Sequence, residues 1–368
     1  MAAGKSSQDL ENDVLSQGLC TSCGACVNVC PYIKVVKDRV AIIEPCGLDE
    51  GKCYDFCPRT TTDVAALDRK VFGEKRADSS LGSYISIEMA QAKDSRLRCR
   101  AQYGGVVSSL IEYAMVSGKI TDALLTRPFD SGLMPRSLLV EGSSEVEGFA
   151  GSNYIASAPL ATLNRNTKRK KGEAVGVVGI PCQVIALRKM QASKHETAAK
   201  KVKLVIGLFC TWALTYKGLH DFLKGKVDLS HVRRFDIPPP PANIFEVDTE
   251  TDSTKFRLDD LRQFIKPTCG ICFDMTSEFA DISVGMVEGI EDWNTLIIRT
   301  PEGKKLIEKA KAAGIIVTKP LDKARFDHLR GASILKKRRA IAEIVKRTGD
   351  DKNLLYLQLA DSERKKYL

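Results

Sequence analysis

Twelve cysteines are the residues of this chain best suited to chemistry, and four of them lie close together near its amino terminus. These four have the spacing C-x2-C-x2-C-x3-C and precede a proline, as Cys20, Cys23, Cys26, Cys30 and Pro31. Bacterial ferredoxins use this spacing, in which three thiolates wrap one cube and the fourth binds the other cluster of a two-cluster module. Zinc does not require cysteines so close together. The spacing therefore predicts a 4Fe-4S cluster.

A second run repeats the ending C-x3-C-P but lacks one cysteine. Cys53 and Cys57 form that ending, and Glu50 stands three residues before Cys53, where the motif has a cysteine. Exchange of ligands between the two runs predicts a first cluster on four thiols, those of Cys20, Cys23, Cys26 and Cys57. The thiols left for a second cluster are those of Cys30, Cys46 and Cys53. Three outcomes are open: a cube with Glu50, Asp49 or solvent on one iron, a three-iron cluster, or no second cluster.

Four later cysteines adjoin apolar runs, and they are Cys182, Cys210, Cys269 and Cys272. The apolar run 174–179 breaks at Gly-Ile-Pro-Cys, and the periodic segment that follows predicts a strand, a turn and a helix. The other three cysteines adjoin two further apolar runs, 203–210 and 280–284. Ends of parallel strands meet at one edge of a sheet, so we expect the four thiols to meet there. They suit one iron–sulfur cube or one zinc ion, and the alternative is a set of unrelated buried cysteines.

The remaining pattern predicts an α/β core with two sites for anions. A strand over 84–90, a helix from Gly104 and Gly105, and a strand over 120–126 fit a right-handed parallel crossover. The glycine pair leaves amide groups free for a phosphate at the helix start. The polar loop 151–154 is expected to enter another helix with its own free amides.

Composition favours an iron–sulfur or redox protein of the cytoplasm. The formal net charge of +10 fits anionic cofactors or an acidic protein partner. The basic runs 168–171 and 336–339 lack interleaved aromatic residues, so we expect solvated surface there and no nucleic-acid site. No apolar stretch is long enough for a membrane span, and residues 1–11 lack the apolar segment of a secretory signal. Twelve cysteines in a cytoplasmic chain indicate metal or redox use rather than disulfides.

These patterns divide the chain into three parts. We expect a ferredoxin-type 4Fe-4S module over 1–70, an α/β core over 71–330 and a helical tail over 331–368. Ile334, Ile341 and Val345 recur on one side of the tail helix. Docking of the tail on its own core is the first expectation, and clasping of a partner subunit is the second.

In its ordered motifs the chain resembles the coenzyme F420 hydrogenase/dehydrogenase beta-subunit family. The stretches that carry the resemblance are 20–31, 53–59, 104–105, 151–154, 179–183, 207–210, 269–272, 280–285 and 293–300. The resemblance implies an α/β core that binds FAD, with one 4Fe-4S cluster near the flavin on the four later cysteines. FAD would lie near Gly104, Gly105, Val106, Ser108, Ser152, Asn153, Tyr154, Gly179, Pro181 and Gln183. The segment 285–289 departs from the Gly-Asp-x-Gly that the family more often has. The family's substrate contacts are therefore not carried over to this segment.

The resemblance also implies the reaction. Flavin exchanges electrons in pairs and each cluster exchanges them singly, so the flavin is the expected junction and no catalytic side chain is predicted. Coenzyme F420 is the first expected two-electron carrier and NAD(P)H the second, with a redox protein, a larger oxidoreductase complex or a ferredoxin as partner. The alternatives are a ferredoxin-dependent reductase of a small organic substrate and a non-catalytic electron-transfer subunit of a larger complex.

Overall fold

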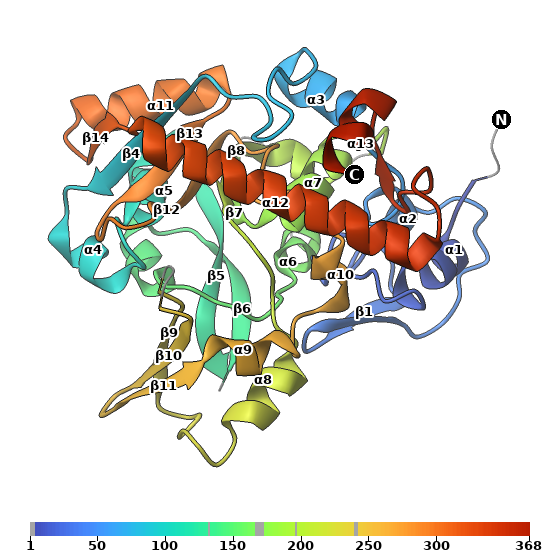
Figure 1. The fold of residues 1–368 in the computed structure, drawn as a ribbon, viewed down its shortest axis with the longest axis horizontal. Coiled ribbons are helices and arrows are strands. Elements are labelled where there is room, and N and C mark those ends of the chain that lie inside the picture. The colour runs from blue at the N-terminus through green and yellow to red at the C-terminus, as the bar shows by residue number, and fades with distance from the viewer. Residues whose placement is uncertain (1–3, 132, 166–172, 196, 239–241) are drawn as a thin grey trace.

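The computed structural model describes residues 4–131, 133–165, 173–195, 197–238 and 242–368 (Figure 1). The predicted solvated run 168–171 lies outside these residues.

The centre of the molecule is a mixed eight-stranded sheet in the order β14-β4-β13-β12-β8-β7-β5-β6. Its strands are β4 Ser86–Ala92, β5 Asp122–Ser131, β6 Met134–Val140, β7 Val175–Gly179, β8 Val202–Leu208, β12 Ile282–Met286, β13 Asn294–Ile298 and β14 Ile316–Pro320. The neighbours β12, β8, β7 and β5 are parallel, and the remaining pairings are antiparallel. The predicted crossover from 84–90 to 120–126 does not join neighbours, because four strands separate β4 from β5.

Helices cover both faces of this sheet, which explains why its central strands are apolar throughout. In β8, Leu204 and Ile206 face one core while Val205 faces the other, as alternation along a strand requires. The first core contains α5 Val106–Val116, η2 Ser143–Phe149 and α11 Pro301–Ala312. The second contains α3 Val64–Phe72, α6 Pro159–Arg165, α7 Pro181–Ala192 and η3 Ala198–Lys201.

The amino-terminal segment packs into the second core rather than standing apart from it. Its elements are α1 Ser7–Leu10, η1 Glu11–Leu15, β1 Ile33–Val36, β2 Arg39–Ile42, α2 Lys52–Asp55 and β3 Thr62–Asp63. The buried side chains of Leu10, Val27 and Phe56 belong to the same apolar cluster as Val184 and Leu187 of α7. The cysteine-bearing loops are therefore held against the start of α7.

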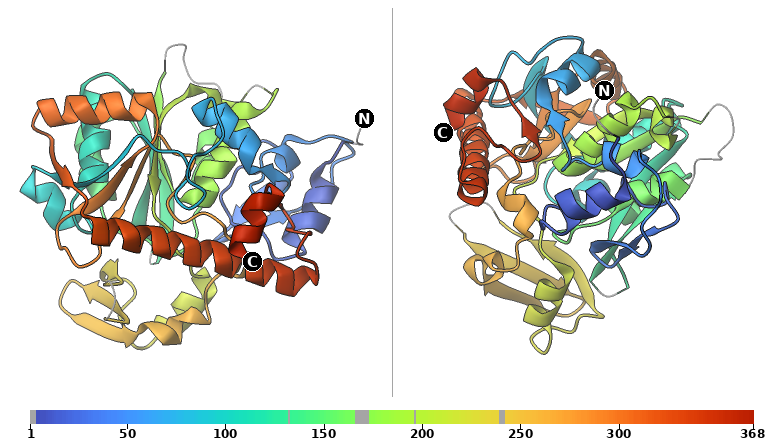
Figure 2. Two further views of the ribbon diagram at one scale, coloured as in Figure 1. Left: turned by 45° about the horizontal axis from the view of Figure 1, so that its top comes forward. Right: turned by 90° about the vertical axis from the view of Figure 1, so that its right-hand side faces the viewer.

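A smaller three-stranded sheet extends away from the main one, as Figure 2 shows. It consists of β9 Val232–Asp236, β10 Ile244–Thr249 and β11 Ser253–Arg257, with α8 Tyr216–Leu223 and α9 Leu258–Arg262 packed on it. The short helices α4 Ser95–Arg100 and α10 Pro267–Gly270 complete the connections.

The carboxyl-terminal segment crosses the molecule from the main sheet to the amino-terminal segment (Figure 1). It comprises α12 Lys323–Thr348, β15 Leu357–Gln358 and α13 Asp361–Tyr367, and β15 pairs with β3. Ile341 is buried and Ile334 and Val345 are partly buried in the second core, so docking on its own chain is confirmed. The expectation that the whole run 336–339 is solvated was wrong. Lys336 and Lys337 are buried, because they face polar groups below α12, and only the two arginines are exposed.

Candidate metal centres and cofactor site

The structure brings together the four thiols of the first predicted set, Cys20, Cys23, Cys26 and Cys57. Burial raises the pKa of Cys23 to about 12, and the thiol of Cys57 adds to the rise. Burial also raises the pKa of Cys26, with contributions from Cys20 and Cys57. The loop wraps tightly because Gly24 has φ of +81°, and a Cβ there would lie 2.7 Å from the Ala161 amide nitrogen.

The second predicted set, Cys30, Cys46 and Cys53, is also brought together, and it is less enclosed. Burial raises the pKa of Cys53 to about 11, with contributions from Cys30 and Cys46. The pKa of Cys46 is instead lowered, chiefly by the Ser7 hydroxyl, whose Oγ lies 3.1 Å from the sulfur. A thiol held by hydrogen bonds near solvent thus forms one corner of this set.

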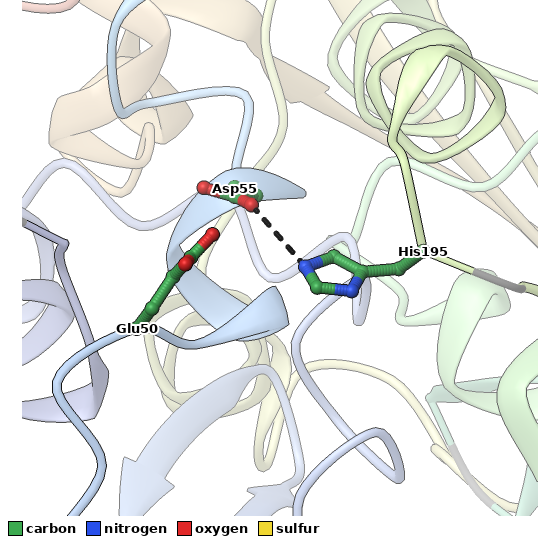
Figure 3. Close-up of side chains that lie close together, drawn as sticks. All are labelled: Glu50, Asp55 and His195. Carbon is green, nitrogen blue, oxygen red and sulfur yellow. Dashed lines mark ion pairs between the residues drawn. The ribbon is translucent and has the colours of Figure 1, made fainter.

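The Glu50 side chain pairs with a lysine outside the second set. Figure 3 shows the carboxylates of Glu50 and Asp55 with the ring of His195. The Glu50 carboxylate accepts the Lys194 ammonium at 2.6 Å, and His195 Nε2 lies 3.7 Å from Asp55 Oδ2. The role of Glu50 as a cluster ligand therefore stays a prediction.

The four later cysteines meet at one edge of the main sheet; we call Cys182, Cys210, Cys269 and Cys272 the core set. Cys182 is the second residue of α7, just after β7, and Cys210 follows the end of β8. Burial raises the pKa of Cys182 well above its ordinary value, and Cys272 adds to the rise. For Cys272 burial acts in the same direction, but the charges of Lys336 and Arg59 outweigh it and lower the pKa. Four thiols without a histidine or carboxylate among them fit an iron–sulfur cube.

The three sets adjoin one another in a row. The thiol of Cys23, from the first set, raises the pKa of Cys182 in the core set after burial and Cys272. The thiol of Cys53, from the second set, contributes to the raised pKa of Cys26. The first set therefore lies between the core set and the less enclosed second set.

Two cations beside the core set were missed from the sequence. The Arg59 guanidinium donates from Nε to Thr268 Oγ1 at 3.0 Å and stacks on the Tyr356 ring at 4.3 Å. The Lys336 ammonium donates to the carbonyl oxygens of Cys210 and Thr211. A basic run on a helix carries no signal of burial, so Lys336 could not be singled out. Arg59, two residues after Cys57, was within the motif but had no predicted role.

Close packing and backbone conformation explain why both positions before α5 are glycine. Gly105 has φ of +68°, and a Cβ on Gly104 would lie 2.7 Å from Asn294 Oδ1. The Val106 amide points toward the same Asn294 oxygen at 3.4 Å. Ser108 lies in the first turn of the helix. Their role in holding a phosphate stays a prediction.

The loop 151–154 approaches this glycine pair, although it does not enter a helix as predicted, because α6 begins only at Pro159. Gln102 joins the two loops: its amide donates to the Tyr154 hydroxyl at 3.0 Å, and its oxygen accepts from Ser152. Asn153 instead closes its own turn on Ile155, at 2.9 Å.

Next to Gln102, Tyr103 has the unusual φ of +68° for a residue with a side chain. Its buried hydroxyl has no hydrogen-bond partner within the described ranges. Burial raises the pKa of this hydroxyl to about 12, and Asp236 adds to the rise. Strained residues with unsatisfied donors cluster at ligand sites in proteins, so Tyr103 is added to the candidate residues here.

The start of α7 is fixed by Gln183. Its side-chain oxygen accepts the Ile180 amide at 3.0 Å, and its amide donates to the Ser157 carbonyl at 3.2 Å. Pro181 occupies the first helical turn, where no amide hydrogen is needed, and Gly179 ends β7. The predicted cofactor residues of this turn therefore lie beside Cys182.

Three family models match the chain in order. A 4Fe-4S binding domain matches residues 14–32. The coenzyme F420 hydrogenase/dehydrogenase beta subunit N-terminal model matches 88–164, and the model of its C terminus matches 172–324. With the fold, the first match places the chain in the class of mixed α/β iron–sulfur-binding proteins.

Individual relatives agree with these models. The beta subunit of coenzyme F420 hydrogenase from Methanothermobacter thermautotrophicus is 31% identical over 249 residues, covering 67% of this chain and 88% of that protein. A chain of the F420-reducing [NiFe] hydrogenase complex from Methanosarcina barkeri superposes with a TM-score of 0.66 and 28% identity, covering 73% of this chain and 95% of that chain. The protein belongs to the coenzyme F420 hydrogenase/dehydrogenase beta-subunit family, as its motifs predicted.

A longer relative is the coenzyme F420-dependent sulfite reductase of Methanocaldococcus jannaschii, 30% identical over 317 residues. The alignment covers 80% of this chain and 46% of that protein, so the chain spans about half of its length. Both named relatives are oxidoreductases. In the part of the chain that the structure describes, we find no helix long and apolar enough to cross a membrane.

Proposed function

We propose that this protein is a flavin- and iron–sulfur-dependent oxidoreductase that connects a two-electron carrier with one-electron clusters. The observation that carries the proposal is the row of thiol sets, in which Cys23 of the first set adjoins Cys182 of the core set. Flavin would supply the exchange between paired and single electrons. The thiols of the chain would hold the clusters that accept or deliver single electrons.

The core set and the first set each offer four thiols, which suits one 4Fe-4S cluster apiece. The three thiols of Cys30, Cys46 and Cys53 suit a more labile second amino-terminal cluster. This gives two or three clusters per chain, reaching from the sheet edge toward the surface near Cys46. Division into a module over 1–70, a core over 71–330 and a tail over 331–368 remains our working description.

FAD is proposed to lie where the loops of Gly105, Tyr154 and Pro181 approach the carboxyl ends of the central strands. Ligands of α/β sheets bind at this edge. The unpartnered Tyr103 hydroxyl supports the assignment, since a bound molecule would satisfy it. The chain would orient the flavin beside Cys182 through backbone amides and side-chain hydrogen bonds.

Coenzyme F420 is the proposed two-electron carrier, because the named relatives include F420 hydrogenase and F420-dependent sulfite reductase. NAD(P)H is the second candidate. Anaerobically purified protein would be mixed with reduced F420, or with NADH, and a viologen dye. We expect reduced F420 to bleach the flavin absorbance and reduce the dye. Failure of both donors to bleach a bound flavin would contradict the proposal.

A second role is favoured by one observation, the likeness to a chain of a hydrogenase complex. In that role the protein would connect a larger redox partner to the carrier. Affinity purification from the native host distinguishes the two roles. Large catalytic subunits in stoichiometric amount would support the complex, and an isolated chain that reduces a ferredoxin would support an independent reductase.

A further inference from the structure

Two buried cations lie against the core set without a carboxylate partner. Arg59 and Lys336 are each 3% exposed, and they come from distant parts of the chain, the ferredoxin-type segment and α12. Among the described residues neither forms an ion pair. By contrast, buried Lys337 is paired with Glu278, and buried Lys266 with Asp38 at 3.3 Å. A buried charge is costly unless an opposite charge accompanies it, so these two cations point to an anion beside them.

The contacts of Arg59 aim it at the core set. Its Nε and Nη2 donate to Thr268 Oγ1 at 3.0 Å and to the Thr268 carbonyl at 3.4 Å, directly before Cys269. The guanidinium is flanked by the Tyr356 ring, whose hydroxyl donates to the Ile271 carbonyl at 2.9 Å. The buried Nη1 has no hydrogen-bond partner in the described parts of the chain. Against the effect of burial, Tyr356 and then the Cys272 thiol raise the pKa of Arg59, so the guanidinium and its unpartnered donor lie beside the core set.

Lys336 approaches the same thiols from the carboxyl-terminal helix. Its ammonium donates to the Cys210 carbonyl at 3.1 Å and to the neighbouring Thr211 carbonyl. Glu278 is already occupied by Arg76 and Lys337, so it does not neutralise Lys336. Buried Asp274 also acts on Cys272 and Cys210, so the chain places two cations and one carboxylate beside the four thiols of the core set.

We propose that Arg59 and Lys336 are the counter-charges of the core cluster and raise its reduction potential. The inference rests on the proposed function, since it takes the core set to hold a 4Fe-4S cluster. A cube with four thiolates is anionic, and it becomes more so when it gains an electron. Nearby cations and hydrogen-bond donors stabilise that reduced form. Both residues are positioning residues, because they act on the cluster and not on the substrate.

The test is an anaerobic redox titration followed by EPR on the full-length protein. The signal of the core cluster is first identified as the one lost in Cys182→Ser. We expect Arg59→Gln and Lys336→Met each to shift the midpoint of that signal to a more negative potential, and the double variant to shift it further. Arg59→Lys should recover most of the wild-type value, because it restores the charge. In Lys336→Met the midpoints of the amino-terminal clusters should move less, whereas Arg59→Gln should also move the midpoint of the first set, because Arg59 acts on Cys20.

Lys337→Met is the matched control, since Lys337 is the neighbouring buried lysine of α12 and has its own carboxylate. It should lower thermal stability and leave the core midpoint unchanged. If Lys336→Met loses the core cluster while keeping the wild-type circular dichroism and Lys337→Met retains it, the result also supports the inference. Unchanged midpoints in both test variants, or equal changes in the control, would overturn it. Wild-type protein without iron would overturn the proposed function instead.

Discussion

The core set and the second amino-terminal set show two ways of building a cluster site. Burial raises the pKa of Cys182 in the core set, and two buried cations lie beside this set. Cys46, in the other set, is partly exposed, and hydrogen bonding with Ser7 lowers its pKa. The core set has four thiols from segments far apart in sequence, whereas the other has three thiols from one segment. Under the proposed function, the core set would hold a cluster shielded by the fold, and the second set a cluster closer to solvent.

The largest expected effect is the loss of the core cluster. Cys182→Ser removes a thiolate from the set that only tertiary structure assembles, so iron should fall by about four atoms per chain. Dye reduction should be uncoupled from flavin bleaching, while EPR still shows the amino-terminal clusters. Cys99→Ser, which changes an exposed cysteine outside the sets, is the control. Unchanged iron and turnover in Cys182→Ser would remove this cysteine from the site.

A smaller loss is expected at the exposed end of the row. Cys46→Ser should abolish or destabilise the second amino-terminal cluster while both four-thiol sets keep their iron. Because Cys46 contacts Ser7 near solvent, oxygen should destroy this cluster first in the wild-type protein. Iron analysis and EPR after timed exposure to air measure both effects. Loss of all cluster EPR signals at the same time would show that the three thiol sets do not hold independent clusters.

The ion pairs of the two regions also differ in burial: Lys337 and Glu278 are buried, whereas Lys194 and Glu50 are exposed. Lys337→Met leaves the buried Glu278 with Arg76 alone and removes one charged hydrogen bond, which should cost about 2 kcal/mol of unfolding free energy. Denaturant titration measures the loss, with the exposed neighbour changed in Arg338→Met as control. A loss equal to that of the control would show that the buried pair does not stabilise the region around the core set.

The smallest effect is expected at Glu50. Its carboxylate pairs with exposed Lys194, so Glu50→Gln should leave the iron content and EPR spectrum unchanged. Glu50→Cys should convert a labile or three-iron signal into an ordinary 4Fe-4S signal only if the second set binds metal. Loss of a cluster in Glu50→Gln would instead show that the Glu50 carboxylate is a cluster ligand.

Local spacing predicted much of this site, and tertiary contacts supplied the rest. The proximity of Cys57 to the thiols of the first motif was predicted from the sequence alone, and so were the strand ends that carry Cys182 and Cys210. Strand β4 was predicted at about the right place, but the antiparallel direction of β13 and β4 was not predicted, because short apolar runs do not reveal strand direction. Lys336 was taken as surface, since its burial depends on how α12 crosses a loop more than a hundred residues earlier.

The most direct test of the central claim is the cofactor content of anaerobically purified protein. Two or three complete clusters and a flavin predict about eight to twelve irons, with equal sulfide, and one FAD per chain. A colourless protein that contains zinc in place of iron and releases no flavin on denaturation would contradict the account.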